Sequence, residues 1–258
     1  MPTALARRPS PRLAEGLITH IERKPVDPEL AVRQWRQYVD VLAQHGWTPV
    51  EVPPVDACPD GVFVEDTMVV YGDLAVIARA GAESRRPEAA AAEEAVREQG
   101  YRITHVTDPG TFDGGDILKV GNIVYVGLGG RTNAEGIRQL AAALTPLGAE
   151  VRAVPVQKVL HLKSAVTALP DGTVIGYEPL VDDPAAFDAF RAVPEEAGAH
   201  VVLLGENRLL MAASAPKSAA LFAELGYTPV VVDISEFEKL EGCVTCLSVR
   251  LRPVSQRR

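Results

Sequence analysis

Residues 133–156 read NAEGIRQLAAALTPLGAEVRAVPV, and this stretch carries the pattern that decides the fold. Its first part has the apolar spacing of an amphipathic helix, Gly148 ends that helix, and the run AEVRAVPV after it is typical of a strand. Two more strand-like runs follow in ALPDGTVIGY at residues 168–177, where Asp-Gly suits a tight hairpin turn. The repeating unit is therefore a helix, a strand and then a hairpin.

The same unit recurs along the 258-residue chain. Expected helices end at Gly46, Gly100, Gly198 and Gly226, and the helix before Gly198 is the weakest because Pro194 interrupts it. Tight-turn pairs also stand inside VVYGDLAVIA, LKVGNIVYVG and LLGENRLLMA. Hairpins require antiparallel pairing, so the sheets of this α/β protein should be mixed. Five units could close into a ring with pseudo-fivefold symmetry, although ordinary helix–strand alternation gives a similar pattern.

Composition limits the class of protein. The formal charge of −8 argues against nucleic acid or an anionic membrane as a partner and is compatible with a cationic small molecule. There is no apolar run of membrane-spanning length and no secretion signal, and three cysteines give no disulfide framework. These features predict a cytoplasmic protein with reduced thiols. No linker divides the chain, so residues 1–258 are expected to form one domain, with the first dozen and last six residues frayed.

The unusual polar residues fall at one place in these units, where the first strand hands over to the hairpin. Carboxylates occur in CPDGVFVEDTMVV and TFDGGDILKV, a histidine in VLHLKSAVTAL and a cysteine in EFEKLEGCVTCLSV. If the units form a ring, equivalent positions converge on its axis and these side chains share a pocket. The residues are Asp60, Glu65, Asp66, Asp113, Asp116, His161, Lys163, Ser164 and Cys246.

The acids and the histidine also have structural explanations. Glu65 and Asp66 could lie on a sheet edge, although acids inside an apolar strand are costly without a purpose. Asp113 could serve a turn, and His161, flanked by leucines, could be a buried core residue.

Cys243 and Cys246 could be buried small hydrophobes, a redox pair or half of a zinc site. A redox C-x-x-C normally opens a helix, whereas VTCLSVRL favours a strand, and the sequence lacks the roughly four clustered ligands that zinc needs. Taken jointly, one cysteine, one histidine and several carboxylates indicate thiol catalysis on a cationic substrate such as a guanidinium group.

Six motifs in order resemble the dimethylarginine dimethylaminohydrolase family of the guanidine-modifying, or pentein, superfamily. They are FVEDTMVV, the Ser-Arg-Arg of GAESRRPE, FDGGD, VGLGGRTN, LHLKSAV and GCVTCLSVRL, and the resemblance runs from about residue 11 to 252. It implies a pentein fold, an α/β propeller of five ββαβ blades, in agreement with the repeat. The related arginine deiminases are typically longer, with an added helical domain for which this chain has no room.

The resemblance also implies a reaction, the hydrolysis of N-ω-methylated arginines to citrulline and methylamines through a covalent thiouronium on cysteine. Cys246 would be the nucleophile, His161 the acid and then the base, and Asp113 the group that orients His161. Cys243 would be a bystander.

The family pattern assigns the two ends of the substrate to different residues. Asp66 would hold the guanidinium nitrogens, with Glu65 of the same motif nearby. Asp60 would bind the α-amino group, while Arg85 and Arg131 would take the α-carboxylate.

The aliphatic pair Leu17 and Ile18 matches a mobile lid segment in the family. No metal and no cofactor are expected, the partner would be a cationic small molecule, and a homodimer is left open. The alternatives are another guanidino-modifying enzyme, such as an arginine or agmatine deiminase, an amidinotransferase or a succinylarginine dihydrolase, or a non-catalytic protein that binds guanidino compounds. A pure binder has no need of the Cys/His/Asp set.

Overall fold

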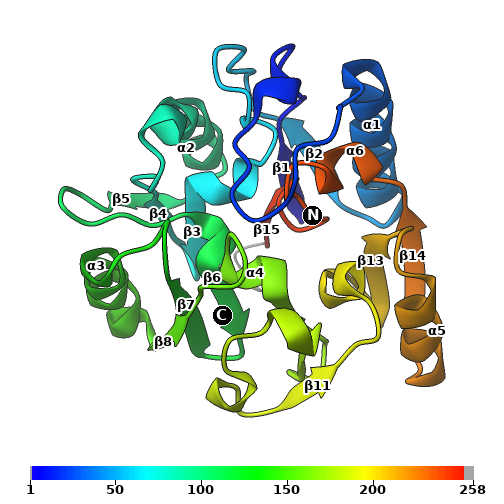
Figure 1. The fold of residues 1–258 in the computed structure, drawn as a ribbon. Coiled ribbons are helices and arrows are strands. Elements are labelled where there is room, and N and C mark those ends of the chain that lie inside the picture. Colours follow the sequence, from blue (N-terminus) through cyan, green and yellow to red (C-terminus); the bar gives the residue numbers. More distant parts are fainter. Residues whose placement is uncertain (1, 253–258) are drawn as a thin grey trace.

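The computed structural model describes residues 2–252 and arranges them as five three-stranded sheets around a central axis (Figure 1). Every sheet is built the same way, with a central strand that pairs antiparallel to one neighbour and parallel to the other. The predicted ring of five units and the predicted mixed sheets are therefore confirmed.

The blades follow one another along the chain, and each of the last four begins with a hairpin. In order, these four comprise β3 (Met68–Tyr71), β4 (Leu74–Ile77) and β5 (Arg102–His105); β6 (Ile117–Val120), β7 (Ile123–Leu128) and β8 (Glu150–Pro155); β9 (Val166–Ala168), β10 (Val174–Gly176) and β11 (Phe190–Ala192); and β12 (Val202–Gly205), β13 (Arg208–Ala212) and β14 (Thr228–Val232).

The first blade joins the two ends of the described chain. Its central strand is β1 (Thr3–Ala6), which pairs parallel to β2 (Thr48–Glu51) and antiparallel to β15 (Val249–Leu251). Ala4 and Leu5 are fully buried, so the prediction of a frayed first dozen residues is wrong. The short segment TALA carries little strand signal of its own, and pairing on both sides is what fixes it. Residues 253–258, also expected to fray, lie outside the described part of the chain.

Helices cover the outside of the ring and connect the central strand to the third strand of a blade (Figure 1). They are α1 (Pro28–Gln44), α2 (Ala89–Glu98), α3 (Ala134–Leu144) and α5 (Pro216–Glu224). The first begins at Asp27, whose side chain accepts hydrogen bonds from the backbone N–H groups of Glu29 and Leu30. It buries Trp35 and Leu42 in an apolar cluster that also holds Ala4 of the first blade and Leu210 of the last.

The fourth blade lacks the expected helix at residues 186–198. Short 3-10 turns and the strand β11 stand there instead. Phe187 and Phe190 have the spacing of residues on one helix face, yet here the chain is extended. Their rings stack with centroids 6.2 Å apart. Phe187 also meets the Tyr125 ring edge-on at 5.1 Å. Aromatic packing on the third blade, together with Pro194, outweighs the helical spacing of this segment.

A cavity of about 470 Å³ lies on the axis, because the innermost strands of all five blades contribute to its wall. Its lining within residues 2–252 is basic, with Lys119, Lys163, Arg250 and Arg252 against the single acid Glu65, and holds no histidine or cysteine. No helix within residues 2–252 is long and apolar enough to cross a membrane.

Candidate active site

Short helical turns bring the candidate residues to the axis. Glu65 and Asp66 lie in a 3-10 turn (Val64–Thr67) just before β3, not inside a strand as the apolar sequence around them suggested. Asp113 directly precedes a second 3-10 turn (Gly114–Asp116) before β6, and His161 precedes α4 (Leu162–Ala165) before β9. The predicted position, at the handover to the hairpin, is confirmed.

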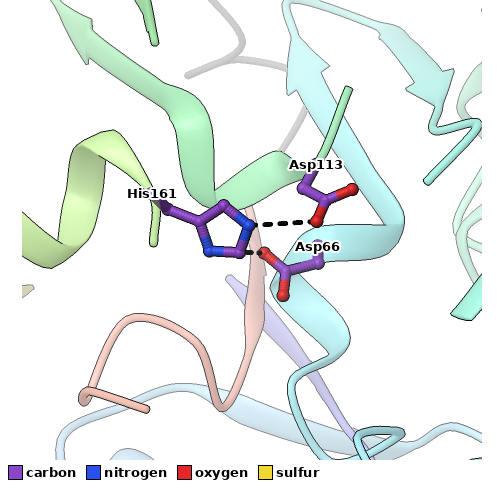
Figure 2. A group of neighbouring side chains, drawn as sticks. All are labelled: Asp66, Asp113 and His161. Atoms are coloured by element: carbon purple, nitrogen blue, oxygen red, sulfur yellow. Dashed lines mark hydrogen bonds and ion pairs between the residues drawn. The ribbon is translucent and has the colours of Figure 1, made fainter. Parts of the chain in front are cut away.

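His161 stands between two carboxylates (Figure 2). Its Nε2 lies 3.0 Å from Oδ2 of Asp113, and its Nδ1 lies 3.8 Å from Oδ1 of Asp66. All three side chains are buried, with the Asp113 side chain fully inaccessible. The triad-like pair of His161 and Asp113 therefore forms, and Asp66 faces the nitrogen that Asp113 leaves free.

This arrangement favours a charged imidazolium next to ionised carboxylates. Burial favours the neutral ring, but the Asp66 carboxylate and the hydrogen bond with Asp113 outweigh it and raise the pKa of His161 to about 9. Burial likewise opposes charge on Asp113, yet its interaction with His161 lowers the pKa of Asp113 to about 2. At neutral pH, His161 is ready to donate a proton.

Two adjacent glycines allow the three turns to meet. A side chain at Gly114 would lie 2.0 Å from the backbone oxygen of Glu65, and one at Gly115 would lie 2.7 Å from both Asp66 and His161. The Gly115 backbone N–H also donates to Oδ1 of Asp66 at 2.9 Å. The D-G-G-D motif is therefore a packing requirement of the site as well as a turn.

Arg85 is buried and bound on several sides by protein groups. It makes a two-pronged ion pair with Glu88, at 3.0 and 2.7 Å, and donates to Oδ2 of Asp66 at 2.6 Å. It also donates to the backbone oxygens of Asp60 and Phe63, both at 3.3 Å. Arg85 is therefore not a solvated loop charge, and its guanidinium is largely occupied by protein groups.

Arg131 is bound by fewer protein groups than Arg85. Its Nη1 lies 3.2 Å from Oδ2 of Asp113, and its side chain keeps 11% exposure in the cavity wall. Its backbone packs closely on Gly81, where an added side chain would lie 2.3 Å from the Arg131 oxygen. The other Asp113 oxygen accepts from the Gly81 N–H at 2.9 Å, so the same contact fixes Asp113.

Glu65 faces the basic axial cavity. Its Oε1 takes ion pairs from Lys163 at 2.6 Å and Arg250 at 2.8 Å. Its Oε2 has no hydrogen-bond partner among the described residues and remains an available acceptor. In this structure Glu65 lines the large cavity and not the small one that holds Asp66. The Glu65–Lys163 pair thus lies at the boundary of the candidate site.

Cys246 lies in a turn before β15 and lines the small cavity together with His161 and Asp66. Its Sγ lies 3.3 Å from Sγ of Cys243, and all three cysteines of the chain, including Cys58, are buried free thiols. The hydrogen bond with Cys243, burial, and the Glu65 and Asp66 carboxylates raise the pKa of Cys246 well above its ordinary value. A bound cation would oppose this shift.

A segment near the N-terminus forms part of the cavity wall. Leu17 lines it, while Ile18 packs against the core of the first blade, so Leu17 is the residue of the pair that faces the site. The Leu17 N–H donates to both oxygens of Asp60, at 3.1 and 3.2 Å. The carboxylate of Glu241 accepts from the N–H groups of Thr19 at 2.6 Å and His20 at 2.9 Å.

The small cavity measures about 10 Å³, which is roughly the room of one water, so an arginine-sized molecule fits only if groups around the cavity move.

Asp66, Asp113 and His161 could also offer three ligand atoms to a metal ion, since these atoms lie within 4.8 Å of one another. Both carboxylates, however, already neutralise arginines, Asp66 with Arg85 and Asp113 with Arg131. A divalent cation would have to compete with these two guanidinium groups for the carboxylate oxygens.

Three supporting residues were missed or left unassigned at the sequence level. Asp116 accepts from Thr132 Oγ1 at 2.5 Å and from the Leu162 N–H at 2.9 Å, which fixes the turn after His161. Glu88 and Glu241 lie outside the six motifs or at their margins. Their supporting role is visible only from their contacts in the folded structure. The D-G-G-D spacing was a signal for Asp116, whereas the sequence gave none for Glu88 and Glu241.

Comparisons with known proteins agree on one family. A family model described as arginine deiminase matches residues 33–215. The chain is 67% identical over 249 residues to the N(G),N(G)-dimethylarginine dimethylaminohydrolase of Streptomyces coelicolor, covering 96% of both chains. It is 36% identical to the protein of the same name from Pseudomonas aeruginosa, covering 95% of this chain and 98% of that one.

Solved structures give the same result. A dimethylarginine dimethylaminohydrolase adduct with S-methyl-L-thiocitrulline matches with a TM-score of 0.89 at 34% identity, covering 96% of this chain and 99% of that one. The Pseudomonas aeruginosa protein complexed with citrulline also gives 0.89 at 34% identity, covering 96% and 98%. The N-terminal domain of the cyanobacterial arginine dihydrolase ArgZ shares the fold, with a TM-score of 0.84 at 21% identity. The chain therefore belongs to the dimethylarginine dimethylaminohydrolase family and has the five-bladed pentein fold.

Proposed function

We propose that this protein hydrolyses N-ω-methylated arginines to citrulline and a methylamine in the cytoplasm. The observation that carries the proposal is the small cavity, which gathers Cys246, His161, Asp66 and Asp60 behind the Leu17 segment. The names of the close relatives, and the citrulline and S-methyl-thiocitrulline bound by family structures, support this substrate class.

In the first step, Asp66 orients the substrate guanidinium, and the cation favours the thiolate of Cys246. The thiolate attacks the guanidinium carbon, and a tetrahedral adduct forms. His161, held on Nε2 by Asp113, presents Nδ1 and protonates the departing methylamine. The raised pKa of His161 suits this role because the proton is present at neutral pH. A thiouronium on Cys246 remains.

In the second step, His161 is neutral and accepts a proton from water. The resulting hydroxide adds to the thiouronium carbon, and collapse of the adduct breaks the C–S bond and releases citrulline. Asp113 keeps the ring oriented and stabilises the imidazolium that forms again. One histidine thus serves both steps.

The α-amino and α-carboxylate groups would lie toward the Leu17 side. Asp60 already binds the Leu17 N–H, so one carboxylate would hold both the ammonium and the closed segment. Arg131 is the better placed carboxylate ligand, since most Arg85 donors are bound to Glu88, Asp66 and backbone oxygens. Arg85 would then act mainly by holding Asp66. Glu65 would support the base of the site and keep Oε2 for a bound group.

The test is to incubate the protein with asymmetric dimethylarginine, monomethylarginine, arginine and agmatine, and to follow citrulline and released amines by mass spectrometry. We expect both methylated arginines to be turned over, and agmatine to react far more slowly because it lacks the carboxylate that Arg131 would bind. Equal kcat/KM for agmatine and dimethylarginine would instead favour an agmatine deiminase, and arginine as the preferred substrate would favour an arginine dihydrolase or deiminase.

A further inference from the structure

Cys243 lies in direct contact with the proposed nucleophile Cys246. Its Sγ lies 3.3 Å from the Cys246 Sγ, while the remaining cysteine, Cys58, contacts neither and lies against the backbone oxygen of Ser84 at 3.9 Å. The sequence left a redox pair open but did not favour it, because a redox C-x-x-C normally opens a helix and VTCLSVRL is typical of a strand. The distance between the sulfur atoms favours such a pair.

The backbone is already folded for a bridge. The Cys246 N–H donates to the Cys243 oxygen at 3.1 Å, which is the hydrogen bond of a four-residue turn. Such a turn holds its end Cα atoms less than about 7 Å apart, a span that overlaps the range of disulfides. Forming the bond requires the sulfur atoms to move from 3.3 Å to about 2 Å, with no break in the turn.

The two thiols differ in access and in charge. Cys246 lines the small cavity and is the one that a molecule in the site reaches first, whereas Cys243 does not line it. Hydrogen bonds from Cys246 and Thr245, the latter with its Oγ1 at 3.3 Å, lower the pKa of Cys243 well below its ordinary value. Cys243 is therefore the partner that lies farther from the cavity, directly behind Cys246.

We propose that Cys243 and Cys246 form a site of reversible oxidation, at which a small hydroperoxide converts the pair to a disulfide. The sulfur of Cys246 attacks the outer peroxide oxygen, the O–O bond breaks, and an alcohol or water leaves with the proton. The sulfur of Cys243 then attacks the sulfenic acid of Cys246, the S–O bond breaks, and the hydroxyl group leaves as water with the proton of the Cys243 thiol. Two thiols and one hydroperoxide thus give one disulfide, one alcohol or water, and one further water.

This modification would block the proposed hydrolysis. For this consequence, the inference rests on the proposed function. Cys246 cannot attack a guanidinium while it is bonded to Cys243, so the enzyme is switched off. The same bond prevents further oxidation of Cys246 to sulfinic or sulfonic acid, which would be irreversible. Thiol reductants restore both sulfur atoms, and activity returns.

The experiment treats the whole protein with a few equivalents of hydrogen peroxide. Peptide mass spectrometry without reduction should find residues 243 and 246 joined, with the loss of two hydrogens. Citrulline formation from dimethylarginine should fall at least tenfold and recover to most of its starting rate with dithiothreitol. Cys58→Ser is the matched control and should behave like the wild type in both readouts.

Cys243→Ser is the decisive variant. We expect it to lose activity on peroxide treatment without recovery by dithiothreitol, and to carry two or three added oxygens on Cys246. Absence of the 243–246 cross-link in wild-type protein whose Cys246 is oxidised would overturn the proposal, as would full recovery of oxidised Cys243→Ser. The cross-link is read by mass alone, so a protein with no activity on methylarginines would still report it.

Discussion

At the scale of single residues, Asp66 connects most of the site. It accepts hydrogen bonds from Gly115 and Arg85, contacts His161 across 3.8 Å, and raises the pKa of both His161 and Cys246. One carboxylate thus favours the protonated base and the protonated nucleophile together. A guanidinium that pairs with Asp66 would weaken both effects, so substrate binding itself would activate the site.

In reduced protein, serine substitutions of the two cysteines should have clearly different effects on turnover. Cys246→Ser should lower turnover by more than about 10³-fold, because a serine hydroxyl is a far weaker nucleophile in this setting. Cys243→Ser should keep most of the activity, since its Sγ does not line the cavity. The measurement is citrulline formation under reducing conditions. The opposite pattern, with Cys246→Ser active and Cys243→Ser inactive, would reverse the assignment.

His161→Gln should separate binding from chemistry. Asp60 and Asp66 remain to hold the cation, so calorimetry should still detect dimethylarginine binding to the variant. Citrulline release should fall by roughly 10²–10⁴-fold, because neither the leaving amine nor the attacking water is served. His105→Gln, on the exposed surface, is the control. Near-normal turnover in His161→Gln would mean that another group transfers the proton.

His161 should also make stability depend on pH. Folding raises its pKa from about 6.5 to about 9, so the folded state binds this proton more tightly than the unfolded chain. The stabilisation, at most roughly 3 kcal/mol, is complete below about pH 6.5 and is lost as the pH rises to about 9. Urea unfolding at pH 6 and pH 9.5 should therefore show a larger drop for wild type than for His161→Gln. An equal drop would contradict the assigned pKa.

At the scale of elements, the sequence predicted what local pattern controls. The hairpin turns and four of the five expected outer helices follow from glycines, turn pairs and apolar spacing, and they place the polar residues at the right end of each unit. The 3-10 turns that carry Asp66 and Asp116 were not predicted, because they depend on neighbouring turns that meet through Gly114 and Gly115. The Arg85–Glu88 pair was missed because nothing in the sequence marks a charge as buried.

The segment over the cavity gives a prediction at this scale. Glu241 accepts two backbone N–H groups, from Thr19 and His20, and therefore holds the segment closed. Glu241→Gln keeps the size but weakens both charge-assisted bonds, so kcat/KM for dimethylarginine should fall about tenfold, mainly through KM. Steady-state kinetics measure the effect, with the exposed Glu224→Gln as control. Unchanged KM would show that this contact does not govern closure.

At the scale of the whole molecule, the ring is held by contacts that no local pattern predicts. Five apolar clusters lie around it, and the strand pairs of the first blade link residues almost a full chain length apart. The five-unit repeat predicted a closed ring, but not which segment closes it. The closure depends on tertiary pairing of β1, whose four residues were expected to fray.

Leu251→Ala tests this closure. Leu251 is 2% exposed and packs in the cluster that contains Leu5 and Val64, so its truncation should lower the free energy of unfolding by about 2–5 kcal/mol. Leu225→Ala, at a leucine 39% exposed on the surface, should cost less than about 1 kcal/mol. Urea denaturation measures both. A similar small cost at the two positions would show that the first blade adds little to the stability of the ring.

The first blade has a further consequence for how the chain can be connected. Thr3 pairs directly with Leu251 in antiparallel register, so Pro2 and Arg252 emerge side by side. The strands β15 and β1 therefore correspond to a fifth hairpin without a connecting turn, whereas the hairpins of the other four blades have one. A short turn from Arg252 to Pro2 would complete it, and new termini could open between Glu206 and Asn207, in the turn between β12 and β13. The circular permutant would keep every blade and every residue of the site, because none of the strand pairs depends on where the chain ends lie.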